Sequence, residues 1–567
     1  MNLLRAALFT VLSLLLVQSV APPVKAESPP ATDWVNADIL RQGERFYRKG
    51  ILPSGKKLKI FSRGKPPVDS TELPCTECHQ RAGFGSVEGG VFTPAITGAA
   101  LFKPALRPVS ANDGVKPTGL SGPAKTHQRP AYTRESLEIA LRVGIDPASR
   151  SLSAIMPRYP LNYIDMSILT TYLESLSSVY SPGASADGFK FATIITDDVS
   201  DADRTALLTP LKQSIAVRNQ QAVMYHNFKN VGFTPTADMK NSFRRATLSV
   251  WELKGSPESW TGQLANYYAQ EPVFAVLGGI SNRDWQPIHD FCEAQQLPCL
   301  FPITDFPVIS ETGGYTQYFS KGFYQEGEGA ARFLNRMDGV TPETRIVQIV
   351  QDSPAGRYLN SGFGETWRKL TLKPVTTVTL DKSQLLDPVV LARVLEEQKP
   401  EVLLLWVDEK MTSKLPDIVA QLPASARIFV SSGYLGKQTA NIPEAVREQI
   451  FITYPYRLSA YVGNKLGPDA NVPILTTAEK FGDSRIASRT GIALSQVTFQ
   501  AVGKLRDNLY RNYLMDILGM TMDQVVPDYE KLSFGPGQRY ASKGCYIVQL
   551  GKGAMPALLP KSEWVIP

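Results

Sequence analysis

The chain has 567 residues, too many for one compact hydrophobic core, so we expect two or three domains. Hydrophobic residues make up 43% of it and charged residues 20%, which is ordinary for a soluble globular protein and not for a disordered one. The net charge of +7 is uneven: residues 27–180 hold 19 Lys/Arg and 14 Asp/Glu, whereas residues 181–567 hold 39 of each. An electrostatic partner would therefore recognise the N-terminal part, and we expect no nucleic-acid partner.

The first 26 residues are typical of a signal peptide. Arg5 provides a positive start, and residues 6–21 form an apolar run that is too short for a comfortable membrane span. Val24-Lys25-Ala26 then resembles a signal-peptidase site, with small residues at its first and last positions. An uncleaved membrane anchor is the alternative. We expect export to the periplasm, without stable membrane insertion of the mature protein.

Residues 27–180 are expected to form an all-α domain. Apolar residues recur at helical spacing over residues 34–49, 133–143 and 163–176, and Thr133 is a plausible N-cap of the second of these helices. The stretch between the first two is rich in Gly and Pro and predicts loops. Small polar residues at 181–188 predict a linker to the next domain.

From residue 189 to residue 567, strand patterns and helix patterns alternate. Asp387 followed by Pro388 is a helix start, because Pro suits the first helical position. Such alternation implies parallel sheets covered by helices, and the segment is too long for one sheet, so we expect a two-lobed, doubly wound α/β domain. The expected strands are 189–196, 273–278, 300–303, 345–350, 402–406 and 427–431, and the expected helices are 206–218, 284–295, 327–337, 362–369, 388–398 and 414–421.

The order Cys75-Thr76-Glu77-Cys78-His79 has the spacing for covalent attachment of haem c. Two thiols one turn apart can each add to a vinyl group, and the adjacent imidazole can then bind the iron. A bare Cys-x-x-Cys could instead be a redox dithiol. Export and the following His favour the first interpretation, so we expect one covalently attached haem c.

Residues 34–177 resemble the class I cytochromes c, in which a Gly/aromatic helix crosses an aromatic-rich C-terminal helix. Here Gly43 and Phe46 would meet Tyr172 and Leu173. The resemblance implies one electron carrier domain, with a periplasmic redox protein or dehydrogenase as its partner.

The resemblance also implies a second axial ligand and a hydrogen-bond acceptor for the imidazole. Met156, followed by Pro157, matches the distal methionine, and Pro94 matches the residue whose carbonyl accepts the proton of the proximal imidazole. Met156 could instead be an ordinary core residue, with Met166 or His127 as the ligand. Iron with both axial positions filled favours electron transfer over catalysis, and a haem peroxidase would need an open position.

Residues 189–560 resemble type I periplasmic solute-binding proteins of the branched-chain amino acid transporter kind. The resemblance rests on segments 274–279, 297–302, 323–329, 352–356 and 402–406, which in the family face a cleft between two lobes. Residues 303–306 bring an acid and an aromatic ring, which argues against a branched-chain amino acid as ligand. Carried over by position, the cleft candidates, each of which could be an ordinary capping or loop residue, are Ser281, Asn282, Thr304, Asp305, Tyr358, Asp408 and Tyr434.

Nothing in the second domain predicts catalysis, since it has no nucleophile elbow, phosphate loop or clustered metal ligands. His226 and His289 are isolated and expected at the surface. The chain is therefore expected to be no enzyme but a periplasmic monohaem cytochrome that transfers single electrons, fused to a small-molecule-binding or docking module. The alternative is a transporter-type solute-binding protein or ligand sensor with an accessory haem.

Two cysteines beyond the haem motif are placed to pair. Cys292 falls in the last turn of the expected helix 284–295, and Cys299 opens the next strand after a short loop. An exported protein meets an oxidising compartment, so we expect a Cys292–Cys299 disulfide. Two buried thiols are the alternative, and Cys545 is expected to be buried and unpaired.

Overall fold

The computed structural model describes residues 31–458 apart from 63, 90, 109–125, 228–243, 311–313 and 372, and residues 486 and 489–565 apart from 525, 527, 536, 537 and 555. The predicted signal peptide, residues 1–26, lies outside the described residues. The chain divides into two compact units. The first consists of the residues up to Pro74 and of Leu106–Leu173, and the second of Cys75–Ala105 and Glu174–Pro567. The expected domain boundaries at residues 180 and 188 stay predictions.

The first unit is built on three helices, α1 (Ala31–Lys49), α4 (Arg134–Arg142) and α5 (Tyr163–Ser175). Thr133 caps α4 as expected, because its side chain accepts a hydrogen bond from the backbone N–H of Ser136. Gly43 of α1 faces α5, where any side chain would collide with Tyr172, so glycine permits the expected crossing of the two helices. Tyr47 then packs on Tyr172 with ring centroids 5.4 Å apart.

The all-α expectation for the N-terminal region is incomplete, because its loops carry short paired strands. In the first unit β1 (Lys59–Ile60) pairs antiparallel with β2 (Val68–Asp69), and β5 (Ala105–Pro108) pairs with β6 (Thr126–Arg129). Glycines at positive φ let the chain reverse between such strands; Gly64 has φ 77°. The part that belongs to the second unit holds α2 (Thr76–His79), the antiparallel pair β3 (Ser86–Glu88) and β4 (Val91–Thr93), and α3 (Gly98–Leu101).

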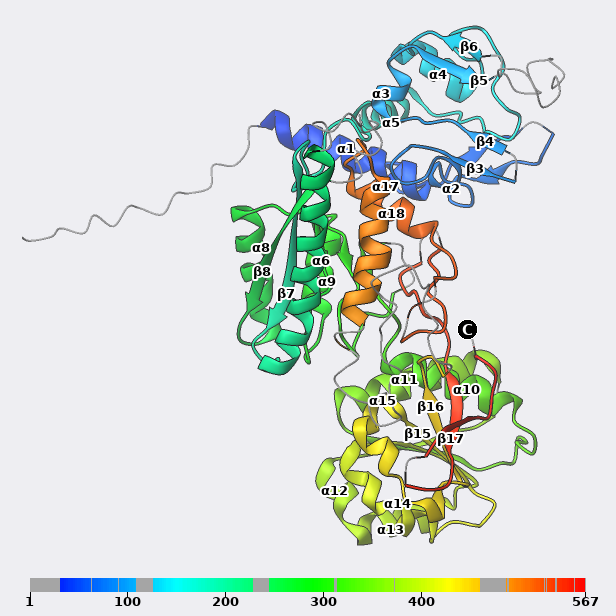
Figure 1. Cartoon of the computed structure of the whole chain (residues 1–567). Helices are drawn as coiled ribbons and strands as arrows, with labels where there is room; N and C mark the ends of the chain where they lie inside the picture. Colours follow the sequence, from blue (N-terminus) through cyan, green and yellow to red (C-terminus); the bar gives the residue numbers. More distant parts are fainter. Residues whose placement is uncertain are drawn as a thin grey trace, which may run out of the picture. The chain divides into compact units, whose positions relative to one another are not determined.

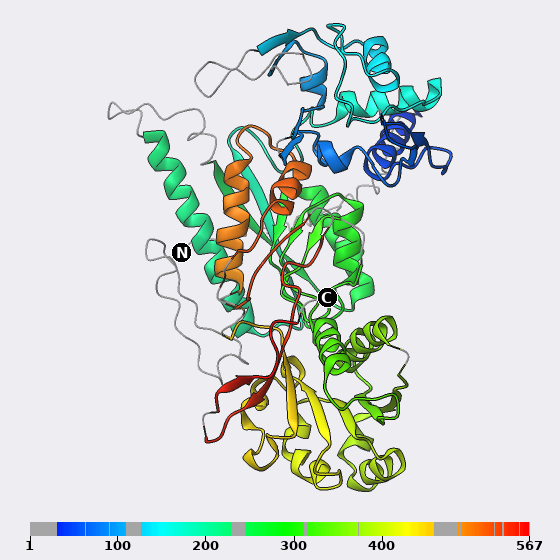
Figure 2. The same cartoon turned by 90° about the vertical axis from the view of Figure 1, so that its right-hand side faces the viewer.

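The first lobe of the second unit is a five-stranded parallel sheet in the order β11-β10-β9-β7-β8. One face packs against α6 (Asp201–Asn227), the π-helix Arg489–Phe499, α17 (Gln500–Lys504) and α18 (Arg511–Gly519) (Figures 1 and 2). The other face packs against α8 (Trp260–Gln270) and α9 (Gln286–Ala294). The strands are β7 (Gly188–Thr196), β8 (Arg245–Leu253), β9 (Ala275–Leu277), β10 (Cys299–Leu300) and β11 (Thr316–Gln317).

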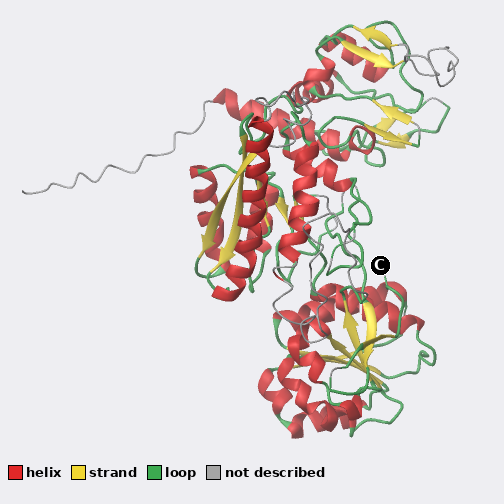
Figure 3. Cartoon of the chain, in the orientation of Figure 1, coloured by secondary structure: helices red, strands yellow, loops and turns green. Residues whose placement is uncertain are grey.

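The second lobe is a seven-stranded sheet in the order β13-β12-β14-β15-β16-β17-β18 (Figure 3). Its first five strands are parallel, and the last two pairings, β16 with β17 and β17 with β18, are antiparallel. Successive residues of its strands pack on opposite faces, so both faces are buried, as in doubly wound folds. The strands are β12 (Ile346–Gln351), β13 (Thr376–Leu380), β14 (Val402–Trp406), β15 (Arg427–Ser431), β16 (Ile450–Tyr454), β17 (Tyr546–Leu550) and β18 (Leu558–Pro560), and the helices are α10 (Phe323–Arg336), α11 (Pro354–Leu370), α12 (Lys382–Leu386), α13 (Pro388–Gln398), α14 (Leu415–Val419) and α15 (Ser432–Leu435).

Both lobes share one strand order. Counted along the chain within each lobe, the parallel strands run 2-1-3-4-5, which is the flavodoxin-like doubly wound arrangement. The expected two-lobed α/β architecture is thus confirmed for residues 188–560. Asp387 also caps α13 as expected, accepting a hydrogen bond from the backbone N–H of Val389 at 2.9 Å.

Helix α11 is twice as long as the pattern predicted, and its glycines explain the difference. The sequence predicts a helix over 362–369, whereas α11 begins at Pro354 after Ser353, whose hydroxyl caps it. A side chain at Gly362 would collide with the carbonyl oxygen of Tyr324, and one at Gly327 with the carbonyl of Leu359. Glycines that weaken a helix by propensity therefore allow α10 and α11 to pack backbone to backbone.

We expect Gly362→Ala to lower the free energy of unfolding by about 1–3 kcal/mol, because the new methyl group must push α10 away. Gly364→Ala is the matched control: it lies on the same helix with no neighbouring atom within 4 Å of the added carbon. That substitution should be neutral or stabilise by up to about 1 kcal/mol. Urea unfolding followed by circular dichroism compares the two, and equal effects would contradict the packing argument.

Candidate functional site

The haem motif forms one short helix. Cys75 precedes α2, Cys78 lies within it and His79 ends it. Neither Cys75 nor Cys78 takes part in a disulfide, and both are half-exposed. His79 is 7% exposed, so its ring is held within the protein.

The imidazole of His79 is oriented by one hydrogen bond. Its Nδ1 lies 3.0 Å from the carbonyl oxygen of Pro94, the acceptor that the sequence analysis expected. A carbonyl only accepts, so Nδ1 carries the proton and Nε2 keeps its lone pair. Burial lowers the pKa of His79 to about 4, which keeps the ring neutral. Two thiols outside any disulfide beside a neutral imidazole fit the donor set of haem c. Met156 lies in the other unit, and its pairing with His79 stays a prediction.

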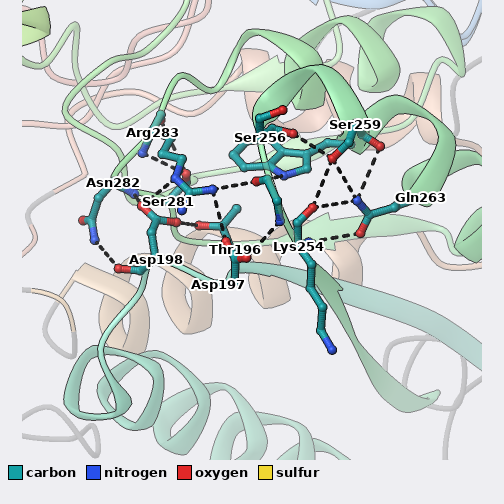
Figure 4. Close-up of polar contacts among 12 residues, drawn as sticks. Thr196, Asp197, Asp198, Lys254, Ser256, Ser259, Gln263, Ser281, Asn282 and Arg283 are labelled. Carbon is teal, nitrogen blue, oxygen red and sulfur yellow. Dashed lines mark hydrogen bonds and ion pairs between the residues drawn. The ribbon is translucent and has the colours of Figure 1, made fainter.

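Ser281 and Asn282 shape the loop after β9 (Figure 4). The Ser281 hydroxyl accepts from the backbone N–H of Arg283 at 3.0 Å, and Asn282 donates its backbone N–H to Asp198 at 3.1 Å. Arg283 completes the network by pairing with Asp197 at 3.1 Å. Both candidates thus stabilise the loop at the carboxyl edge of the first sheet.

The three candidates of the second lobe also have partners within the protein. Asp408 accepts from the backbone N–H of Lys410 at 3.0 Å and pairs with Lys382 at 2.9 Å. The Tyr434 hydroxyl lies 2.6 Å from Ser353 Oγ. Tyr358 packs edge-on against Phe306, with centroids 5.3 Å apart. Burial raises the pKa of Tyr358 and of Tyr434 to about 12, so both remain protonated phenols.

Thr304 and Asp305 line a small pocket. They follow β10 of the first sheet, whereas Tyr456 follows β16 of the second, so the pocket lies where carboxyl ends of strands from both lobes meet. Beyond Thr304, Asp305 and Tyr456, its lining residues are Pro302, Ile303, Tyr318, Phe319, Ser320, Arg489 and Tyr529.

Arg489 is the cationic side chain of this pocket. Its guanidinium lies over the Tyr456 ring, 5.0 Å from the centroid, and donates to the Tyr456 hydroxyl. Its Nε is 3.9 Å from the Asp528 carboxylate. Burial lowers the pKa of Arg489, but the phenols and carboxylates around it outweigh that effect and raise the pKa above its usual value. The pocket therefore presents a permanent positive charge and hydroxyl groups among aromatic rings.

Sequence reasoning found two of the ten lining residues. Thr304 and Asp305 follow a recognisable strand, but Arg489 and Tyr529 reach the pocket from chain segments in which the sequence predicts no element. The aromatic residues at 318 and 319 carry no local sign of a ligand site. Only the tertiary fold brings these residues together.

A buried carboxyl group lies beside the same edge of the second sheet. Glu326 of α10 is 2% exposed and accepts hydrogen bonds from the Thr453 hydroxyl at 2.6 Å and from the backbone N–H of Gly433 at 3.1 Å. Burial outweighs these bonds, and the nearby Asp305 charge acts with it, so the pKa of Glu326 is raised to about 7.

Three cysteines and one histidine outside the haem motif are buried in the core: Cys292, Cys299, Cys545 and His289. Cys292 and Cys299 are joined by a disulfide with Cα atoms 6.2 Å apart, and Cys545 is buried outside any disulfide. The expectation that His289 lies at the surface is wrong: it is buried, and its Nδ1 lies 2.9 Å from the Tyr318 hydroxyl. The side chain of His226 lies outside the described residues.

The described residues hold neither a cluster of metal ligands nor a helix that could span a membrane. They contain no group of three or more His, Cys, Asp or Glu side chains placed to hold a metal ion. None of the helices in this part of the chain is long and apolar enough to cross a membrane.

Solved structures similar to this chain are substrate-binding proteins of transporters. A fatty acid substrate-binding protein from Thermomonospora curvata is 16% identical, with 69% of this chain and 95% of that chain covered and a TM-score of 0.42. A leucine-binding protein from Thermotoga maritima is 14% identical, with 67% and 99% covered and a TM-score of 0.46. A solute-binding protein from R. palustris, in complex with benzoate, is 14% identical, with 67% and 98% covered and a TM-score of 0.41.

No protein-family model matches the chain, and no curated protein matches it. The matches among solved structures correct one expectation. We expected single-electron transfer by a cytochrome as the main function, whereas these neighbours are transporter substrate-binding proteins. They agree with the solute-binding part of the alternative expectation.

Glu326 should make the stability of the protein fall as pH rises. Its pKa is about 7 in the folded protein and 4.5 in its ordinary state, so the folded state favours the protonated form. The stabilisation is complete below pH 4.5 and is lost as pH rises through 7, by about 3 kcal/mol at most. Urea unfolding from pH 5 to 8 should show this loss in the parent and in the exposed control Glu396→Gln, but not in Glu326→Gln. Parallel profiles for all three proteins would contradict it.

Proposed function

We propose that the chain is an exported solute-binding protein or ligand sensor of the periplasm, with one covalently attached haem c as an accessory group. The observation that carries the proposal is the pocket at the meeting of the two sheets. In doubly wound folds ligands bind outside the carboxyl ends of the strands, and here strand ends of both lobes line one pocket. The proposal assigns no catalytic step to the chain.

A small molecule in this pocket would contact both lobes at once. Thr304 and Asp305 belong to the first lobe and Tyr456 follows the second sheet, while Arg489 offers guanidinium N–H donors. Hydrogen bonds to a charged group contribute more than those between neutral groups, so Arg489 is the side chain that we expect to anchor a polar ligand. The aromatic rings would cover its apolar part.

The haem would be held by the residues of the short helix α2. Cys75 and Cys78 would supply the two thioether bonds, and Nε2 of His79 would bind the iron while Pro94 fixes the ring. Met156 is the proposed second axial ligand. The crossing of α1 and α5 at Gly43 and Tyr172 supports the resemblance of residues 34–177 to class I cytochromes c. When bound, the haem supplies a coloured, redox-active iron centre.

Small-molecule binding is tested by thermal unfolding with leucine, benzoate and a fatty acid, the ligand classes named for the neighbours. A ligand that binds only the folded state raises the midpoint of unfolding. Arg489→Gln should weaken binding of the active probe about tenfold or more, which corresponds to about 1.4 kcal/mol. The control Arg357→Gln changes an arginine whose side chain is 60% exposed and should bind as the parent does. A protein stabilised by none of these probes, or parental affinity in the Arg489→Gln variant, would count against the pocket.

Haem attachment is tested on protein secreted from a host with a c-type cytochrome maturation system. We expect intact-protein mass spectrometry to find one haem per chain in the parent and in the control Cys545→Ala. The double variant Cys75→Ala/Cys78→Ala should carry none covalently. Met156→Ala should retain the haem but bind cyanide more readily, because one axial position opens. A parent protein without covalent haem would refute this part of the proposal.

A further inference from the structure

The haem motif segment is built into the first lobe of the solute-binding fold. Immediately after His79, the backbone N–H groups of Arg81 and Ala82 donate to the two carboxylate oxygens of Asp516 at 2.9 and 2.8 Å. Asp516 lies on α18 and is 5% exposed. Hydrogen bonds to a buried carboxylate are strong, so this pair holds the segment tightly to α18.

The side chain of Arg81 extends this attachment to a second element. Its Nη1 donates to the carbonyl oxygen of Gly314 at 2.8 Å, and its guanidinium lies over the Tyr315 ring, 4.6 Å from the centroid. The Tyr315 hydroxyl in turn donates to Asn512 of α18 at 2.7 Å. The segment that carries the haem motif thus contacts the start of the stretch Gly314–Ser320, which we call the strap.

The far end of the strap forms a wall of the pocket. Tyr318, Phe319 and Ser320 line the pocket. Tyr315, which contacts Arg81, lies five residues before Ser320 and therefore roughly 16 Å from it, at about 3.3 Å per extended residue. One chain segment therefore touches both the ligand pocket and the anchor of the haem motif.

Backbone hydrogen bonds hold the strap on both sides. On one side Cys299 donates its N–H to the Tyr315 carbonyl at 2.9 Å. On the other, Tyr318 donates to the Arg539 carbonyl at 2.7 Å, and Ser542 donates to the Phe319 carbonyl at 2.7 Å. These bonds fix the strap on both sides between Tyr315 and Phe319.

We propose that the strap couples the pocket to the haem motif, so that occupancy of the pocket changes the surroundings of the haem. This inference rests on the proposed function, since it needs both a ligand pocket and an attached haem, and it favours a ligand sensor over a transport protein. The coupling is reciprocal, as any coupling between two binding sites must be. Arg81 is the residue that links the strap to the haem motif segment.

The test uses a covalent occupant, which removes the need to know the ligand. In the haem-loaded protein, Ser320→Cys is labelled with benzyl methanethiosulfonate, and mass spectrometry confirms one label and one haem. The hyperfine-shifted haem methyl signals in the proton NMR spectrum of the oxidised protein are then compared before and after labelling. We expect these signals to shift. The same label on Ser383→Cys, an exposed position of α12 in the second lobe, should leave them in place.

A second variant tests the route. In Ser320→Cys/Arg81→Leu the guanidinium contacts with Gly314 and Tyr315 are lost, while the backbone bonds to Asp516 can persist. The label-induced shift should fall by at least half. If Ser320→Cys fails to fold, Thr304→Cys places the same label in the same pocket.

Unmoved haem signals after full labelling, or an equal shift in the Arg81→Leu background, overturn the coupling. A chain without covalent haem overturns it as well, together with the haem proposal. The solute-binding proposal is tested separately. A probe that raises the midpoint of thermal unfolding supports the pocket even when the haem signals do not shift.

Discussion

A single buried carboxylate, that of Asp516, makes two parts of the sequence into one structural unit. It accepts the backbone N–H groups of Arg81 and Ala82, and it does so from a helix residue 435 positions beyond Arg81. Because a buried carboxylate is costly to leave without donors, the fold is complete only when the haem motif segment is in place. The segment Cys75–Ala105 is therefore part of the second unit rather than an appendage to it.

Single elements of the fold could be predicted where the local sequence pattern suits the burial of that element in the folded protein. The strand 402–406 has the same limits in the structure, because a continuous run of Val and Leu suits a sheet buried on both faces. Asp387 with Pro388 fixed the start of α13 for a similarly local reason. Strand β8 was not predicted, although it pairs with β7 along its whole length, since its mixed polar pattern is half-buried at the edge of the sheet.

The pocket could be predicted only in part, because its chemistry comes from residues that have no local reason to meet. Thr304 and Asp305 stand at a strand end and are found by position. Arg489 becomes a site residue only when the π-helix packs beside α6 and turns its first residue toward Tyr456. His289 shows the same limit: a buried imidazole is acceptable only because the Tyr318 hydroxyl lies beside it. The Cys-x-x-Cys-His sequence is the opposite case, since its residues are adjacent in the chain and the short helix α2 alone brings them together.

The strap also has a mechanical consequence. Past Tyr318 it runs beside residues 541–542 with hydrogen bonds between them, and both stretches continue into the second lobe. Sliding one lobe across the other would shear these bonds, whereas bending the paired stretches leaves them intact. The two hydrogen-bonded stretches therefore resist sliding past each other more than they resist bending together. A change in the angle between the two lobes would therefore bend these paired stretches rather than separate them.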